Sequence, residues 1–158
     1  MIIGVLADTH IPKRARDLPP QAYQHLEQAD AIIHAGDVLT MELLERLGRI
    51  APVYAVLGNN DHGLTLPEQL ELRWERVTLA VVHNSGPREG RAARLRRWFP
   101  GAQAVVFGHS HIPMSERHDG LLLFNPGSPT DRRRQPHHTM GLLRITDSRI
   151  EGEIIRLD

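Results

Sequence analysis

Five short apolar segments of this chain are each followed at once by polar residues of the types that bind metal ions. Three of the segments, residues 1–7, 31–35 and 53–57, are near-continuous apolar runs. Such runs are typical of strands that are buried on both faces of a sheet. Ligands collect at the carboxyl ends of the strands in open α/β sheets, so we expect the five polar segments to converge on one crevice.

The polar segments combine carboxylate, imidazole and amide groups. In chain order they are Asp8-Thr9-His10, Gly36-Asp37, Gly58-Asn59-Asn60-Asp61, His83 and Gly108-His109-Ser110-His111. A mixed nitrogen and oxygen ligand set suits Mn, Fe, Ni, Zn or Co better than an all-oxygen Mg or Ca site. The chain contains no cysteine, which excludes thiolate metal sites and cysteine nucleophiles. More ligands are present than the three or four that one catalytic ion takes, so the pattern predicts a binuclear centre with a bridging carboxylate.

The remaining segments predict an α/β fold in a single domain over residues 1–158. Helices are expected between the first three strands, at 19–29 and at 40–47 with Thr40 as the N-cap, which makes these strands parallel. The second half predicts a hairpin of 70–74 with 77–82, a strand at 102–107 and two further hairpins, one at Asp119-Gly120 and one joining 140–146 to 150–157. An arginine-rich amphipathic helix is expected over 87–99, with its core face formed by Ala92, Ala93, Leu95, Trp98 and Phe99.

The composition of the chain argues against nucleic acids and membranes as its partners. The formal net charge is 0, from 19 basic and 19 acidic residues, so no overall field favours a nucleic-acid backbone. Aromatic residues make up 4% of the chain, too few for a base-stacking surface. No apolar run approaches the roughly 18 to 20 residues of a membrane span, and the apolar N-terminal run lacks a basic leader. We therefore expect a cytoplasmic protein with a small-molecule substrate and neither a membrane nor a nucleic-acid partner.

The order and spacing of the five polar segments resemble the motifs of the calcineurin-like metallophosphoesterase superfamily, and within it the small YfcE-type phosphodiesterases of bacteria and archaea. The similarity spans residues 1 to about 145 and extends to the segment Asn125-Pro126-Gly127-Ser128-Pro129. It implies a four-layer α-β-β-α sandwich of two mixed sheets flanked by helices. It also implies the metal ligands, which are Asp8, His10 and His111 for the first ion, Asn59, His83 and His109 for the second, and Asp37 as the bridge.

These residues predict a phosphoesterase that uses two divalent transition-metal ions, with Mn the first choice and Ni, Fe, Zn or Co as the others. Hydrolysis of a small phosphodiester would proceed by in-line attack of a metal-bridging hydroxide, so no protein nucleophile is required. Two catalytic roles fall to this chain. Asp37 holds the ions together, and Asn60 donates a hydrogen bond to a phosphate oxygen without having a proton to release.

The chain departs from the family pattern at two positions. Asn60 stands where many members have a histidine that protonates the leaving group, and Asn84 follows His83 where the family usually has glycine. The first departure leaves open an alternative function, a non-catalytic protein-interaction scaffold such as the subunit of this fold in the vacuolar-sorting retromer complex.

Some polar residues near the motifs are assigned other roles. His34, inside an apolar segment, is expected to be a hydrogen-bonded core residue, and Asp61 is expected to orient a ligand or a turn. The basic run Arg132-Arg133-Arg134 has three interpretations. Arg132 and Arg133 bind substrate phosphate, or the run contacts a second subunit of a homo-oligomer, or it is a solvated loop.

Overall fold

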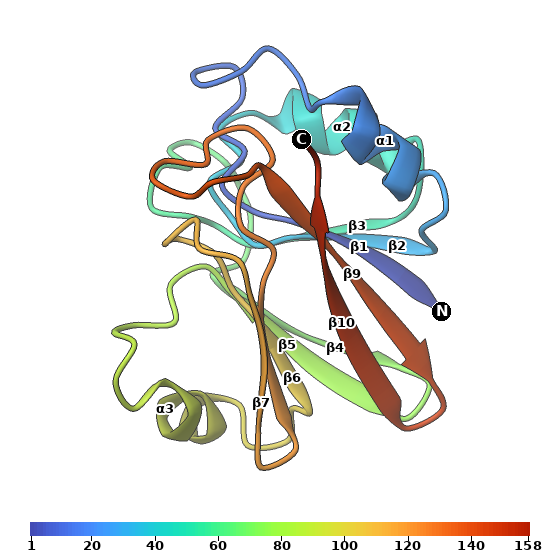
Figure 1. The fold of residues 1–158 in the computed structure, drawn as a ribbon, viewed down its shortest axis with the longest axis vertical. Helices are drawn as coiled ribbons and strands as arrows, with labels where there is room; N and C mark the ends of the chain where they lie inside the picture. The colour runs from blue at the N-terminus through green and yellow to red at the C-terminus, as the bar shows by residue number, and fades with distance from the viewer.

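Strand β1 (Ile2–Leu6) lies in the middle of a five-stranded sheet, in a computed structural model that describes all residues 1–158 (Figure 1). The strand order is β10-β9-β1-β2-β3. The other members are β2 (Ala31–His34), β3 (Val53–Ala55), β9 (Thr139–Thr146) and β10 (Arg149–Arg156). As predicted, β1, β2 and β3 are parallel, and the hairpin of β9 and β10 joins β1 in antiparallel register.

A second five-stranded sheet contains the middle part of the chain in the order β4-β5-β6-β8-β7. Its members are β4 (Gln69–Trp74), β5 (Val77–Val82), β6 (Ala104–Val106), β7 (Met114–His118) and β8 (Leu121–Asn125). Strands β5, β6 and β8 are parallel, and the edge strands β4 and β7 are antiparallel to their neighbours. Both predicted hairpins of this region are therefore present.

Three short helices cover the outer faces of the two sheets. Helices α1 (Pro20–Leu26) and α2 (Met41–Gly48) pack on the first sheet, and α3 (Arg91–Trp98) packs on the second (Figure 1). The four layers thus follow the order α-β-β-α, which confirms the predicted fold class. None of the helices combines the length and the apolar character needed to cross a membrane.

The alternation of side chains along β1 explains its unbroken apolar sequence. Ile3, Val5 and Ala7 are fully buried in the core between the sheets, where they pack with residues such as Val81. Leu6 points the other way, into the core beneath α1 and α2. Because successive side chains of a strand face opposite sides, a strand with a packed layer on each side needs apolar residues at every position.

The helix predicted over 87–99 is shorter than expected and buries fewer of its side chains. It begins at Arg91, because Gly90 adopts a left-handed conformation (φ 69°), which prevents the helix from extending further toward the N-terminus. In a helix of eight residues, one face alone reaches the sheet, and it carries Leu95 with Phe99 just beyond the helix. Ala93 and Trp98, predicted to face the core, are exposed, and the Trp98 side chain lies edge-on to Phe99.

Candidate metal centre

The loops after β1, β2, β3, β5 and β6 bring the seven predicted ligands into one connected cluster. Parallel strands end at the same edge of a sheet, and the two sheets present these edges side by side. Interatomic distances of 2.9 to 4.0 Å link the members of the cluster one to the next. The cluster consists of Asp8, His10, Asp37, Asn59, His83, His109 and His111.

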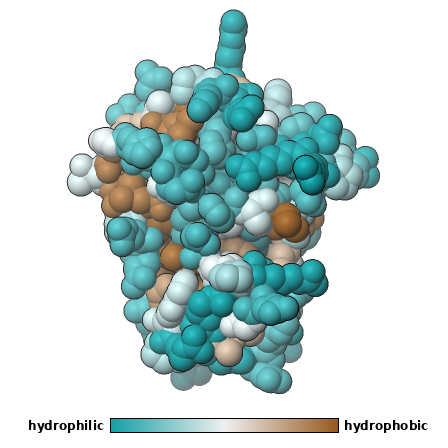
Figure 2. Space-filling view, turned by 90° about the vertical axis from the view of Figure 1, so that its left-hand side faces the viewer, coloured by the Kyte–Doolittle hydropathy of each residue, from teal (hydrophilic) through white to brown (hydrophobic).

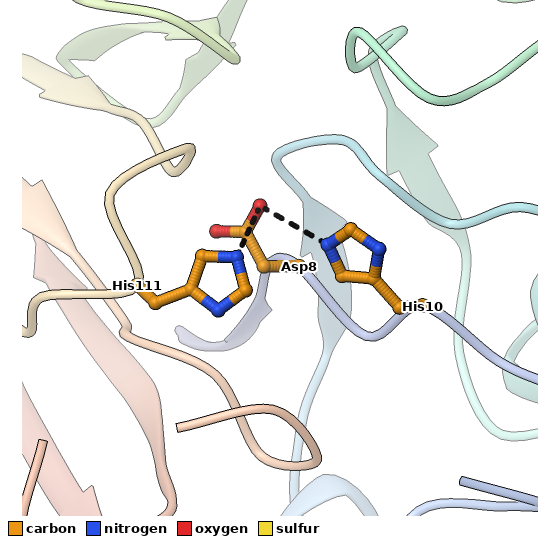
Figure 3. Close-up of side chains that lie close together, drawn as sticks. All are labelled: Asp8, His10 and His111. Atoms are coloured by element: carbon orange, nitrogen blue, oxygen red, sulfur yellow. Dashed lines mark ion pairs between the residues drawn. The ribbon is translucent and has the colours of Figure 1, made fainter. Parts of the chain in front are cut away.

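Asp8, His10 and His111 form the first group that could hold a metal ion (Figure 3). Oδ1 of Asp8 lies 3.6 Å from Nε2 of His111 and 4.0 Å from Nε2 of His10. Both imidazole rings point toward this carboxylate, and all three side chains are buried. The three facing atoms are buried and have no hydrogen-bond partner. A buried polar atom without a partner costs about 1 to 3 kcal/mol, so this arrangement fits a bound cation.

Asp37 lies between the two halves of the cluster. Its Oδ2 is 3.3 Å from Nε2 of His10 and 3.5 Å from Nε2 of His83. A carboxylate that bridges two ions must face ligands of both, and this position meets that requirement. Asp8 also approaches the second half, with Oδ1 3.8 Å from Nε2 of His83, so it belongs to both groups that could hold an ion.

Backbone carbonyl groups orient two of the histidines. Nδ1 of His83 lies 2.7 Å from the carbonyl oxygen of Ala35, and Nδ1 of His111 faces the carbonyl oxygen of Asp131. A carbonyl oxygen only accepts, so each Nδ1 carries the proton and each Nε2 presents its lone pair to the cluster. Nε2 of His83 then faces Oδ1 of Asn59 at 2.9 Å, and a cation bound to both atoms would satisfy them together.

The backbone of the cluster is strained. Asp8, His10, Asp37, His109 and His111 all have positive φ angles, between 46° and 74°. The left-handed region costs an ordinary L-residue about 1 to 2 kcal/mol, with a smaller cost for aspartate. Strain of this kind concentrates where a function requires particular side-chain positions.

Glycine is required beside Asp37 because the chain passes too close for a side chain. A Cβ atom at Gly58 would lie 2.1 Å from Oδ1 of Asp37, and one at Gly36 would lie 2.6 Å from Nδ1 of His83. The glycines of the Gly-Asp and Gly-Asn motifs therefore let three loops meet around one carboxylate.

Asp61 fixes the two loops that carry Asp37 and Asn59. Its Oδ2 accepts the backbone N–H groups of Asp37 and Gly58 at 2.9 and 2.8 Å, and its Oδ1 accepts that of Leu39 at 2.7 Å. The carboxylate is buried, and all three of these bonds come from backbone N–H groups. The prediction that Asp61 orients its surroundings is confirmed.

Residues 125–131 support the first ligand loop, a role that the motif pattern did not reveal. The Ser128 hydroxyl donates to the carbonyl oxygen of Asp8 at 2.8 Å, and the Thr130 hydroxyl donates to that of Thr9 at 2.6 Å. Asn125 supports another ligand loop, the one after β6, by donating from Nδ2 to the carbonyl oxygen of Gly108. The only sequence signal for this role was the resemblance of segment 125–129 to the family.

Burial sets the protonation states within the cluster. It lowers the pKa values of His10, His83 and His111, which favours the neutral imidazole that binds metal. It also raises the pKa of Asp8 well above its usual value, and the negative charge of Asp37 raises it further. Burial acts in the same direction on the pKa of Asp37, but two hydrogen bonds from Asn60 and the charge of His83 outweigh it and keep that pKa low.

His34 is a core residue beneath the cluster, as predicted. Its Nδ1 accepts the backbone N–H of Gly36 at 3.1 Å, so the proton is on Nε2, which lies 3.0 Å from the hydroxyl of Thr9. The side chain is fully buried, and burial lowers its pKa to about 3.

A polar cleft of about 460 Å³ lies beside the cluster. His10, Asn60 and Arg133 are among its lining residues, and Leu39 is the one hydrophobic residue there. Arg132 is not part of the lining, because its guanidinium donates to the carbonyl oxygen of Gln135 at 2.7 Å. The structure therefore places one of the two arginines predicted to bind substrate beside the cluster and turns the other away.

Known proteins resemble this chain over its whole length. The model of the calcineurin-like phosphoesterase superfamily domain matches residues 1–148. A probable metallophosphoesterase of Methanothermobacter thermautotrophicus is 34% identical over 99% of this chain and 92% of its own length. Another, of Methanocaldococcus jannaschii, is 36% identical over 100% of this chain and 82% of its own. The crystal structure of wild-type Vps29 from Entamoeba histolytica complexed with zinc has the same fold, with a TM-score of 0.81, 22% identity and coverage of 99% of both chains.

Proposed function

Because the chain belongs to the calcineurin-like phosphoesterase superfamily, as its motifs indicated, we propose that it is a binuclear metal-dependent phosphodiesterase acting on small phosphate esters. The observation that carries the proposal is the set of three buried atoms without partners, on Asp8, His10 and His111. Buried polar atoms in folded proteins nearly always have a hydrogen-bond partner, and a bound ion would supply the partner that these three lack.

The two ions would be held by the cluster as follows. Asp8, His10 and His111 would bind the first, Asn59, His83 and His109 the second, and Asp37 would contact both. When bound, the ions lower the pKa of a water molecule and neutralise charge on the phosphoryl oxygens. Mn is the first ion to test, because a mixed set of imidazole, carboxylate and amide ligands accepts it together with Ni, Fe, Zn and Co.

Asn60 has a double role in this proposal. Its Nδ2 donates to Oδ2 of Asp37 at 2.9 Å and its backbone N–H donates to Oδ1 at the same distance, so it fixes the bridging carboxylate. An amide carries two N–H protons, and the second remains for a phosphate oxygen in the cleft that Asn60 lines. The amide cannot release a proton at neutral pH, so departure of the leaving group depends on its own stability as an anion.

The experiment that tests the function combines metal analysis with hydrolysis. Protein stripped of metal is titrated with Mn, bound ions are counted per chain, and hydrolysis of bis(p-nitrophenyl) phosphate is compared with that of p-nitrophenyl phosphate. Two ions per chain and faster hydrolysis of the diester are expected. Asp37→Ala should abolish activity and weaken the binding of both ions, because Asp37 would contact both. Asp30→Ala removes an exposed carboxylate bonded to the backbone N–H of Ile2 and should change neither activity nor metal content. A stoichiometry below one with every metal tried would refute the binuclear model.

Asn60 is also the observation that favours the alternative, an interaction scaffold without catalysis. The fold shared with Vps29 is compatible with that function. However, large exposed hydrophobic side chains are few and come from separate parts of the chain, namely Met41, Trp98 and Ile112. If metal binds in the expected ratio and no phosphoester is hydrolysed with any of the five metals, the scaffold becomes the better explanation.

A further inference from the structure

The cleft beside the metal centre carries more positive charge than one phosphodiester group requires. Lys13 and Arg14, from the loop after β1, and Arg133, from the loop before β9, all line it. One carboxylate, Asp131, is also present, and its Oδ2 lies 3.5 Å from Nε of Arg14. Neither Lys13 nor Arg133 forms an ion pair or donates a hydrogen bond from its side chain. Two cations are therefore available to a ligand.

Arg133 is close enough to act on the metal centre. It lines the same cleft as His10, a candidate ligand of the first ion, and as Asn60, which donates two hydrogen bonds to Asp37. Its backbone is in the left-handed region (φ 51°), within a turn closed by the hydrogen bond from the N–H of Gln135 to the carbonyl oxygen of Arg132. This strained turn places Arg133 in the cleft while its neighbour Arg132 bonds to Gln135.

The cleft also has the size and polarity for a larger anionic ligand. Its volume of about 460 Å³ is within the range of about 300 to 1,000 Å³ that is typical of sites for small organic molecules, so a phosphoryl group at the metal centre leaves room beyond it. Its lining offers almost no apolar contact for a hydrophobic group. Hydrophilic residues predominate on the face of the molecule that the loops form (Figure 2). A second phosphate, with a charge of about −1.5 to −2 at pH 7, would match the two unpaired cations.

We propose that Lys13, Arg14 and Arg133 form a second anion site, which selects phosphodiesters that carry an additional phosphate group away from the scissile phosphorus. The proposal rests on the phosphodiesterase function proposed above and names its substrate class. Lys13 and Arg133 bind the additional phosphate, and Arg14 contributes charge while it is held by Asp131.

Two substrates that differ only in the additional phosphate test the proposal. They are the p-nitrophenyl ester of thymidine 5'-phosphate and the same ester with a 3'-phosphate, which share the scissile bond and the leaving group. The 3'-phosphate should lower KM about tenfold, since two exposed charge contacts contribute roughly threefold each. The double variant Lys13→Gln with Arg133→Gln should lose this advantage, so that its KM values for the two esters become equal. A matched variant, Arg49→Gln with Arg97→Gln, removes two exposed arginines outside the cleft and should behave as the unmodified protein.

Ligand binding gives a second measurement that does not depend on turnover. In equilibrium dialysis against the metal-loaded protein, thymidine 3',5'-bisphosphate should bind about tenfold more tightly than thymidine 5'-monophosphate, and the Lys13 and Arg133 double variant should remove the difference. Equal affinities of the unmodified protein for the two ligands, or a difference that survives in the double variant, would overturn the anion site. Absence of hydrolysis of both esters, with the affinity difference intact, would instead contradict the phosphodiesterase function alone.

Discussion

Replacement of Asp61 by asparagine tests whether one buried carboxylate holds the metal-binding loops in place. Asp61 accepts three backbone N–H groups, from Asp37, Leu39 and Gly58, at 2.7 to 2.9 Å. Leu39 itself has a φ of 77°, a strained conformation for a leucine that this bond helps to maintain. The asparagine side chain has nearly the same shape, so the change alters charge and hydrogen bonding and leaves no cavity.

The expected cost follows from these three bonds. A hydrogen bond to a charged group contributes about 1.5 to 3 kcal/mol and a neutral one about 0.5 to 1.5, so the two bonds that the amide oxygen can keep weaken by about 1 kcal/mol each. The amide nitrogen would face a third N–H donor and leave it unsatisfied, at a cost of about 1 to 3 kcal/mol. The sum for Asp61→Asn is about 3 to 5 kcal/mol. For a chain of this length, that corresponds to a fall in Tm of roughly 6 to 20 °C.

Denaturant titration and thermal melting in the presence of a chelator measure this cost separately from metal binding. Asp30→Asn is the matched control, because it makes the same chemical change at an exposed carboxylate that accepts one backbone N–H, from Ile2 at 2.8 Å. It should cost less than about 1.5 kcal/mol. Metal affinity of Asp61→Asn should fall about 10- to 100-fold, as is typical when a group that orients ligands is lost. A loss of less than about 1 kcal/mol for Asp61→Asn would show that the loops are held by other contacts.

Three further outcomes are expected. Without an imidazole at position 60, aryl phosphodiesters should be hydrolysed much faster than alkyl ones. Asn60→His should raise the rate on alkyl esters most, because a general acid raises the rate of hydrolysis by about 100- to 10,000-fold. Equal rates across leaving groups would contradict this. Burial lowers the pKa of His34 to about 3 from the usual 6.5, so below about pH 6.5 the unfolded chain binds more protons than the folded one. The free energy of unfolding should therefore fall as the pH drops below about 6.5. Denaturant titrations at several pH values should show a shallower dependence on pH for His34→Gln. Gly58→Ala should displace Asp37 and reduce metal content measured by elemental analysis, whereas Gly48→Ala, where no atom lies within 4 Å of the new Cβ, should retain it.

The sequence alone determined the framework of this protein and the identity of the residues at its centre. Apolar runs such as residues 1–7 require packing on both sides, because strands with no polar face cannot border water. The polar motifs follow these strands directly, so the parallel arrangement that the connecting helices impose brings their side chains to one edge. Spacing along the chain was sufficient because each ligand lies within a few residues of the strand that positions it.

The tertiary structure decided what depends on contacts between distant segments. The carbonyl oxygen of Asp131 orients His111, and the hydroxyl of Ser128 supports Asp8 across more than a hundred residues, which no local pattern encodes. Likewise, Lys13 and Arg133 are ordinary exposed cations in the sequence and become neighbours of one cleft because the loops after β1 and before β9 meet there. The sequence specifies the chemical group that each side chain carries. The charges and hydrogen-bond partners around that group depend on which loops pack beside it.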